Sequence, residues 1–184
     1  MKNQGKCGAC WAFSSVATLE SMALFKGEHV NLSEQQLIDC SNKYGNQGCN
    51  GGLIYQGLSY VKDYGITTAA AFPYTGKTGF CQIDGGSFKI ENVLYVKGCA
   101  DLQNAAAERV IGISADATNW NKYSSGIFNT CGTRLNHDIA LVGYNNIYWK
   151  IKNSWGVSWG ENGYMRLAKG NTCGVCADKS AWPQ

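Results

Sequence analysis

Apolar residues recur at helical spacing through the first half of the chain. The segment 11–25 is apolar on most sides, which predicts a largely buried helix that ends before Gly27. Ser33 precedes a second helical segment and is expected to cap it, with Gln36 as its reciprocal capping-box partner. A third helix is predicted over residues 53–62.

The second half of the chain has the pattern of β-strands. Strands are predicted at 88–96, 110–115, 138–144, 147–153 and 164–168, with a short helix near 102–108. Asn145 and Asn146 suit a tight hairpin, because asparagine tolerates positive φ. We therefore expect one α+β domain, 1–184, with a mainly helical lobe (1–92) packed face to face against a mainly β lobe (93–184).

Composition excludes several classes of protein. Of the 184 residues, 45% are hydrophobic and 16% are charged, a balance that argues against disorder. A net charge of +3 gives no reason to expect nucleic acid as a partner. No apolar run approaches the roughly 18 residues of a membrane helix, so no membrane span is expected. The nine cysteines are an odd number, which suggests disulfides plus one free thiol.

Cys10 is the candidate for the free thiol. It follows small residues and starts the first apolar helix, and the positive end of a helix dipole is expected to lower the pKa of a thiol there. A general base must lie nearby for that sulfur to act as a nucleophile.

The chain contains only two histidines. His29 lies in a polar turn and is read as an exposed loop residue. His137 stands at the start of an apolar strand, and Asn153 ends the next strand. Adjacent antiparallel strands would place these two side chains together, so Asn153 would orient the imidazole.

These residues resemble the papain family of cysteine peptidases, in its cathepsin L-like branch. The likeness rests on Cys7-Gly8-Ala9-Cys10-Trp11, on His137 and Asn153, which follow Cys10 by 127 and 143 residues, and on Gln4. It extends to segments 49–52 and 153–160. The resemblance implies the two-lobed papain fold with the active site in the cleft between the lobes, and a reaction that needs no cofactor and no metal.

The resemblance also implies roles for individual residues. Cys10 would attack the scissile carbonyl from a resting ion pair with His137, and Gln4 would donate to the oxyanion beside the Cys10 N–H. Trp155 would shield the contact between His137 and Asn153 from water and would bind substrate by lining the leaving-group side of the cleft. Gly51 and Gly52 would bind extended substrate. Each role has a simpler alternative. Gln4 could be a surface residue on a flexible start, Trp155 could be a plain core residue, and the two glycines could mark only a tight turn.

The pocket for the second residue before the scissile bond departs from the family pattern. Asp138 follows the histidine where relatives usually carry a small residue, and the floor is expected at Asp178 or Lys179. Two acidic groups would favour a basic or polar substrate side chain. The alternatives are that Asp138 points to solvent or that it weakens activity by stabilising imidazolium. The remaining expected substrate-binding residues are Leu53, Ile54, Ser114, Leu135 and Asn136.

Disulfide pairing is likewise implied by the resemblance: Cys7 with Cys49, Cys40 with Cys81, and Cys131 with Cys173. Parity then suggests a fourth bridge, Cys99 with Cys176. Two C-x-x-C pairs, Cys7 to Cys10 and Cys173 to Cys176, offer the competing interpretation of a zinc or redox site.

The sequence therefore predicts a cysteine endopeptidase that forms a thioester acyl-enzyme. The alternative is a catalytically impaired homologue with a binding or structural role. The expected partners are peptide or protein substrates and, by resemblance, an inhibitory propeptide and cystatin-like inhibitors, with the protein a monomer in a lysosome-like vacuole or secreted. The resemblance also implies a longer segment ahead of Gln4 than this chain shows.

Overall fold

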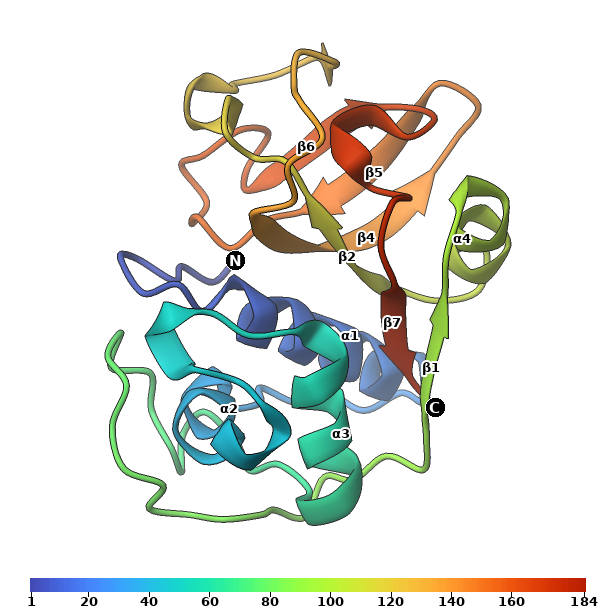
Figure 1. Ribbon diagram of the computed structural model, residues 1–184. Coiled ribbons are helices and arrows are strands. Elements are labelled where there is room, and N and C mark those ends of the chain that lie inside the picture. The colour runs from blue at the N-terminus through green and yellow to red at the C-terminus, as the bar shows by residue number, and fades with distance from the viewer.

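The first half of the chain folds into three helices that lie together at one side of the molecule (Figure 1). The computed structural model describes all residues from 1 to 184. The helices are α1 (Cys10–Phe25), α2 (Glu34–Cys40) and α3 (Ile54–Tyr64). α1 faces the sheet, and Ser14 Oγ donates a hydrogen bond to Ile139 O at 2.8 Å. All three predicted helices are thus present.

The helix ends follow the sequence signals with one exception. α1 stops before Gly27, which adopts a φ of 81°, and Ser33 Oγ accepts the Gln36 N–H at 3.0 Å as expected of an N-cap. The prediction that the Gln36 side chain completes the capping box is wrong. The Ser33 N–H donates to Thr67 O at 3.0 Å, and Gln36 Oε1 accepts the Thr67 N–H at 2.7 Å. Thr67, which is distant in sequence, therefore bonds to both the Ser33 N–H and the Gln36 side chain.

The second half forms a sheet of seven strands in the order β1-β7-β2-β4-β5-β6-β3. The strands are β1 (Val93–Val96), β2 (Ile111–Ala115), β3 (Ile127–Phe128), β4 (His137–Tyr144), β5 (Tyr148–Lys152), β6 (Tyr164–Ala168) and β7 (Ser180–Pro183). The helix α4 (Cys99–Ala106) lies between β1 and β2 in the chain. The predicted strand 88–96 is shorter, because Phe88 instead forms an isolated bridge with Ile66. Strands β3 and β7 were not predicted; both are short and lack alternation.

The β4–β5 hairpin turns at the expected place by another mechanism. The only non-glycine residues with positive φ are Asn162 and Cys173, so the proposed use of positive φ at Asn145 and Asn146 is wrong. Instead, Asn145 Oδ1 accepts the N–H groups of Ile147 and Tyr148, each at 2.9 Å. The asparagine side chain thus closes the turn.

Two hydrophobic cores underlie the two halves of the molecule. The helical core contains Trp11, Leu19 and Leu58, while Trp120 and Trp149 lie in the core of the sheet. β7 returns from the end of the chain and contributes Ala181 to the helical core. A strand that follows residue 92 in the chain thus packs in the core of the helical half. The lobe boundary at residue 92 therefore stays a prediction.

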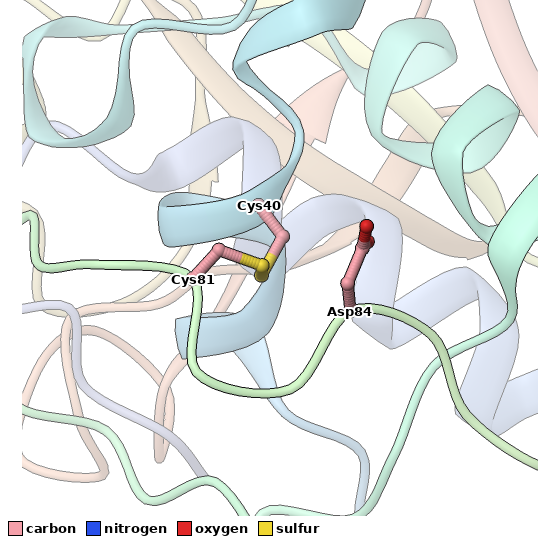
Figure 2. A group of neighbouring side chains, drawn as sticks. All are labelled: Cys40, Cys81 and Asp84. Atoms are coloured by element: carbon pink, nitrogen blue, oxygen red, sulfur yellow. A yellow bond between two sulfur atoms is a disulfide. The ribbon is translucent and has the colours of Figure 1, made fainter.

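Four disulfides are present, and they match the expected pairs: Cys7–Cys49, Cys40–Cys81, Cys131–Cys173 and Cys99–Cys176. In the first C-x-x-C pair Cys7 is bonded to Cys49 while Cys10 is free, and in the second Cys173 and Cys176 are bonded to different partners, so the zinc or dithiol alternative is wrong. Figure 2 shows Asp84 beside the Cys40–Cys81 bridge, where the two sulfurs are bonded to each other and are not available as thiolate ligands. No helix has the length and apolar character needed to cross a bilayer.

Candidate active site

Cys10 is the one cysteine without a disulfide partner, and it is the first residue of α1. It lines a cavity of about 380 Å³ together with His137, which begins β4. One side of this cavity comes from the helical half of the chain and the other from the sheet. The cavity therefore brings the candidate nucleophile and base together from segments 127 residues apart.

The imidazole of His137 is oriented by Asn153, the residue after β5. His137 Nε2 lies 2.8 Å from Asn153 Oδ1, and the histidine is only 7% exposed. The same Oδ1 accepts the N–H of Ser154 at 2.8 Å, which identifies it as the oxygen of the amide. Because an amide oxygen only accepts, Nε2 carries the proton. Nδ1 is then left as the proton acceptor of the neutral imidazole.

Trp155 covers this contact. Its ring centroid lies 4.9 Å from that of His137, at an angle of 34° between the ring planes. Trp159 packs edge-on against Trp155 at 5.1 Å and donates its Nε1–H to Trp120 O at 3.0 Å. Trp155 thus lies where the shielding role requires it, and Trp159 takes part in the aromatic packing behind it.

Burial favours the neutral forms of both candidate catalytic groups. It raises the pKa of the Cys10 thiol to about 11, with a further contribution from the nearby charge of Asp138. It lowers the pKa of His137 to about 4, against the opposing effect of the hydrogen bond with Asn153. The expectation that the start of α1 lowers the pKa of Cys10 is therefore wrong. The backbone N–H groups of Asp138, Trp11 and Cys10 do favour the thiolate, but burial outweighs them.

Gln4 is held firmly rather than lying on a flexible start. It is 7% exposed, its backbone N–H donates to Ser154 O at 2.8 Å, and its backbone oxygen accepts the Tyr74 hydroxyl at 2.6 Å. The side-chain Oε1 accepts the Ser154 hydroxyl at 2.6 Å, and Nε2 donates to Cys7 O at 2.9 Å. One N–H of the amide remains available to a ligand.

Gly51 and Gly52, the two glycines expected to bind substrate, are glycine for different physical reasons. Gly51 has a φ of 123°, and a Cβ there would meet nothing within 4 Å. A Cβ on Gly52 would come within 2.5 Å of Asn46 Oδ1 and 2.7 Å of the Trp11 ring. Gly52 is thus required by packing within the protein, whether or not substrate lies beside it.

Most predicted pocket residues border the same cavity. Those that line it are Gly51, Gly52, Leu53, Ser114, Leu135, Asn136, Asp138 and Asp178. Ile54 does not, because it is only 4% exposed and packs in the helical core. Of the two residues proposed for the pocket floor, Asp178 borders this cavity, whereas Lys179 does not and lies over the Tyr95 ring at 4.7 Å.

Asp138 is buried rather than directed to solvent. It is 8% exposed, and Ser114 Oγ donates to its Oδ1 at 2.6 Å across the β2–β4 pair. Burial raises the pKa of this carboxyl to about 6, with Asp178 adding to the effect. Its charge disfavours the Cys10 thiolate, so the structure connects Asp138 with the sulfur more directly than with the imidazole.

Sequence reasoning missed several residues that shape the site. Gly8, Cys49 and Asn50 also line the cavity, and Ser154 and Tyr74 hold Gln4. The first three lie within motifs named in the sequence analysis, although no role in lining the cavity was expected of them. The role of Tyr74 depends on a contact across 70 residues that no local pattern signals.

The fold and site are those of a papain-type protein, and comparison with known proteins agrees. The model of the papain family cysteine proteases matches residues 1–182, and the chain belongs to this family. Cathepsin L 2 of Paramecium tetraurelia is 44% identical over 184 residues, covering 98% of this chain and 59% of that protein. A cathepsin L-like protein of Caenorhabditis elegans is 39% identical and covers 100% and 60%, respectively.

Solved structures show the same architecture. A cysteine protease of Carica candamarcensis, crystallised in complex with E-64, superposes with a TM-score of 0.93 at 37% identity, covering 100% of this chain and 92% of that chain. Procathepsin L 3 of Tenebrio molitor gives a TM-score of 0.91 at 37% identity, covering 99% and 65%. The chain spans about 59% of the Paramecium relative.

Proposed function

We propose that the protein is a cysteine endopeptidase that hydrolyses peptide bonds through Cys10 and His137. One observation carries the proposal. The single free thiol of the chain borders the same cavity as an imidazole whose Nε2 is held 2.8 Å from Asn153, so that the basic Nδ1 remains available. Family membership agrees with this activity.

Burial favours the neutral thiol of Cys10 and the neutral imidazole of His137 as the resting pair. Nδ1 of His137 takes the thiol proton as the sulfur attacks the carbonyl carbon, so the positive and negative charges arise together. Their attraction in a site of low dielectric constant offsets part of the cost of burial. The resulting tetrahedral oxyanion would be bound by the Cys10 N–H, which has no helical partner at the start of α1, and by Nε2 of Gln4.

Two bond-breaking steps complete the reaction. The tetrahedral intermediate expels the amine, which takes the proton from His137, and leaves a thioester on Cys10. His137 then removes a proton from water as the water oxygen attacks the thioester carbon. Departure of the Cys10 sulfur releases the carboxylic acid, and the returned proton restores the starting thiol.

The partners and location follow from the same assignment. Peptide or protein substrates would lie along Gly51 and Gly52, and the relatives solved as proforms support a role for an inhibitory propeptide. Cystatin-like inhibitors would bind the same cavity. Four disulfides support a lysosome-like vacuole or the secreted fraction as the location, and we propose a monomer.

Hydrolysis of fluorogenic peptides by purified variants tests the function. Cys10→Ala and His137→Ala should each lose peptidase activity by at least about 10³-fold. His29→Ala removes the other histidine, an exposed one, and should keep it. A folded wild-type protein that cleaves no peptide would favour the impaired homologue instead.

A further inference from the structure

Asp138 is a buried carboxyl group without a cation. Its Oδ1 accepts the Ser114 hydroxyl at 2.6 Å, whereas no protein group is hydrogen-bonded to its Oδ2. The side chain borders the cavity that contains Cys10, and the only other carboxylate there is Asp178. No lysine or arginine lines this cavity. A buried carboxylate without a positive partner is unfavourable, and a ligand that brings one would be stabilised.

No lysine near Asp138 is paired with it either. A second, small cavity of about 20 Å³ also borders Asp138, and its other charged lining residues are Lys2, Glu20, Glu34 and Lys152. Lys2 is already paired with Glu20 and Glu34, at 2.7 and 2.6 Å. No salt bridge joins Asp138 to either lysine.

The groups nearest to the carboxyl on the cavity side are also uncharged or negative. β2 contributes Ser114, α1 contributes Cys10, and the segment before β7 contributes Asp178. His137 precedes Asp138 on β4, and burial lowers its pKa to about 4, so it is neutral at higher pH. The protein therefore leaves the cation to be supplied from outside.

We propose that Asp138 is a specificity-determining residue that selects a lysine or arginine side chain of the substrate for the cavity beside Cys10. This inference rests on the proposed peptidase function. The cavity of about 380 Å³ has the size of a small-molecule pocket. Leu53 and Leu135 offer apolar contacts to the methylene stem of such a side chain, and Asp178 adds negative charge at the exposed edge.

The selection should depend on pH. Because burial raises the pKa of Asp138 to about 6, the carboxyl is mostly neutral below that pH and negative above it. A neutral acid attracts a cation weakly. The preference for a basic over an apolar side chain should therefore increase as the pH rises through about 6.

Paired fluorogenic peptides provide the test. They differ only in arginine or leucine at the second position before the scissile bond. For the wild type, kcat/KM should favour arginine, and the ratio of the two values should rise about tenfold between about pH 5 and pH 7. The ratio cancels any effect of pH on Cys10 itself, and it needs no variant.

Asp138→Asn should lower the arginine-to-leucine ratio by about tenfold or more at neutral pH and remove its pH dependence. Asp101→Asn, an exposed carboxyl on α4, is the matched control and should leave the ratio unchanged. Equal or better cleavage of the leucine peptide by the wild type at neutral pH, or a ratio that does not change with pH, overturns the proposal.

Binding to the Cys10→Ala variant separates this inference from the peptidase assignment. Isothermal titration with the same two peptides measures affinity without catalysis. Tighter binding of the arginine peptide, lost on adding Asp138→Asn, supports the selection even if the wild type cleaves nothing. Cleavage by the wild type with equal affinity for both peptides supports the peptidase and rejects the selection.

Discussion

The hydroxyl of Ser154 donates a hydrogen bond to Oε1 of Gln4 at 2.6 Å. The contact joins the segment before α1 to the loop after β5, and it fixes which end of the Gln4 amide is the donor. Ser154 is also the residue whose N–H fixes the amide of Asn153, at 2.8 Å. One residue therefore orients both the proposed oxyanion donor and the side chain that holds His137.

Ser154→Ala should lower kcat by about tenfold with little change in KM, because the Gln4 amide loses the partner that orients it. Gln4→Ala, which removes the donor itself, should cost about 10²-fold or more. Steady-state kinetics on one peptide measures both variants. Ser125→Ala removes an exposed hydroxyl and is the control. A Ser154→Ala variant with wild-type kcat would show that the contact does not position the amide.

Asn153→Asp should raise the pKa of His137, since a carboxylate at 2.8 Å from Nε2 favours the imidazolium. The acid limb of the kcat/KM profile should then move to higher pH than in the wild type. Asn121→Asp, which adds the same charge at an exposed site, should leave the limb in place. An unmoved acid limb in Asn153→Asp would contradict the assigned contact.

The wild-type pH profile should have two limbs set by buried groups. His137, with a pKa of about 4, must be neutral to accept a proton, so activity should rise as the pH passes about 4. Asp138, with a pKa of about 6, becomes negative above that value and disfavours the Cys10 thiolate. For a peptide without a basic side chain, kcat/KM should therefore fall above about pH 6, and Asp138→Asn should remove that fall. A profile that stays flat through pH 6 in both proteins would refute this link.

Much of the fold could be predicted from the sequence where local chemistry decides the structure. The three helices of the first half, the Ser33 cap and the strands β1, β2, β4, β5 and β6 follow from periodicity and capping residues. β3 and β7 could not be predicted, because their residues show no alternation of apolar and polar positions and pair only once the sheet exists. The prediction that Gln36 completes the capping box was wrong because its side chain instead accepts a hydrogen bond from Thr67, a contact that the local sequence does not signal.

In the candidate site, the identity of the main residues could be predicted from the sequence, but their protonation chemistry could not. Motif spacing named Cys10, His137, Asn153 and Gln4, and the structure places their side chains around one cavity or its immediate supports. The pKa of Cys10 could not be inferred from its place on α1 alone, because burial depends on the opposite lobe. Asp138 stood out in the sequence only as a departure from its relatives, and burial decides its chemistry.

The Cys99–Cys176 bridge joins α4 to the segment before β7 across a sequence separation of 77 residues. Its removal in a Cys99→Ala/Cys176→Ala variant should lower the free energy of unfolding by about 2–4 kcal/mol. Urea denaturation followed by tryptophan fluorescence measures the change. Alkylation of the denatured, unreduced wild type should label Cys10 alone, and labelling of Cys99 and Cys176 as well would show that the bridge is absent.

The proposed peptidase activity requires Cys10 to be an activated nucleophile in a substrate-binding cavity. Intact-mass spectrometry after treatment of the folded protein with E-64, the compound bound in the Carica protease structure, tests it most directly. The wild type should gain one inhibitor per chain on Cys10, the Cys10→Ala variant should gain none, and labelling should track the loss of peptide hydrolysis. A folded wild-type protein that remains unlabelled while cysteine-specific alkylation shows Cys10 to be accessible would contradict the account.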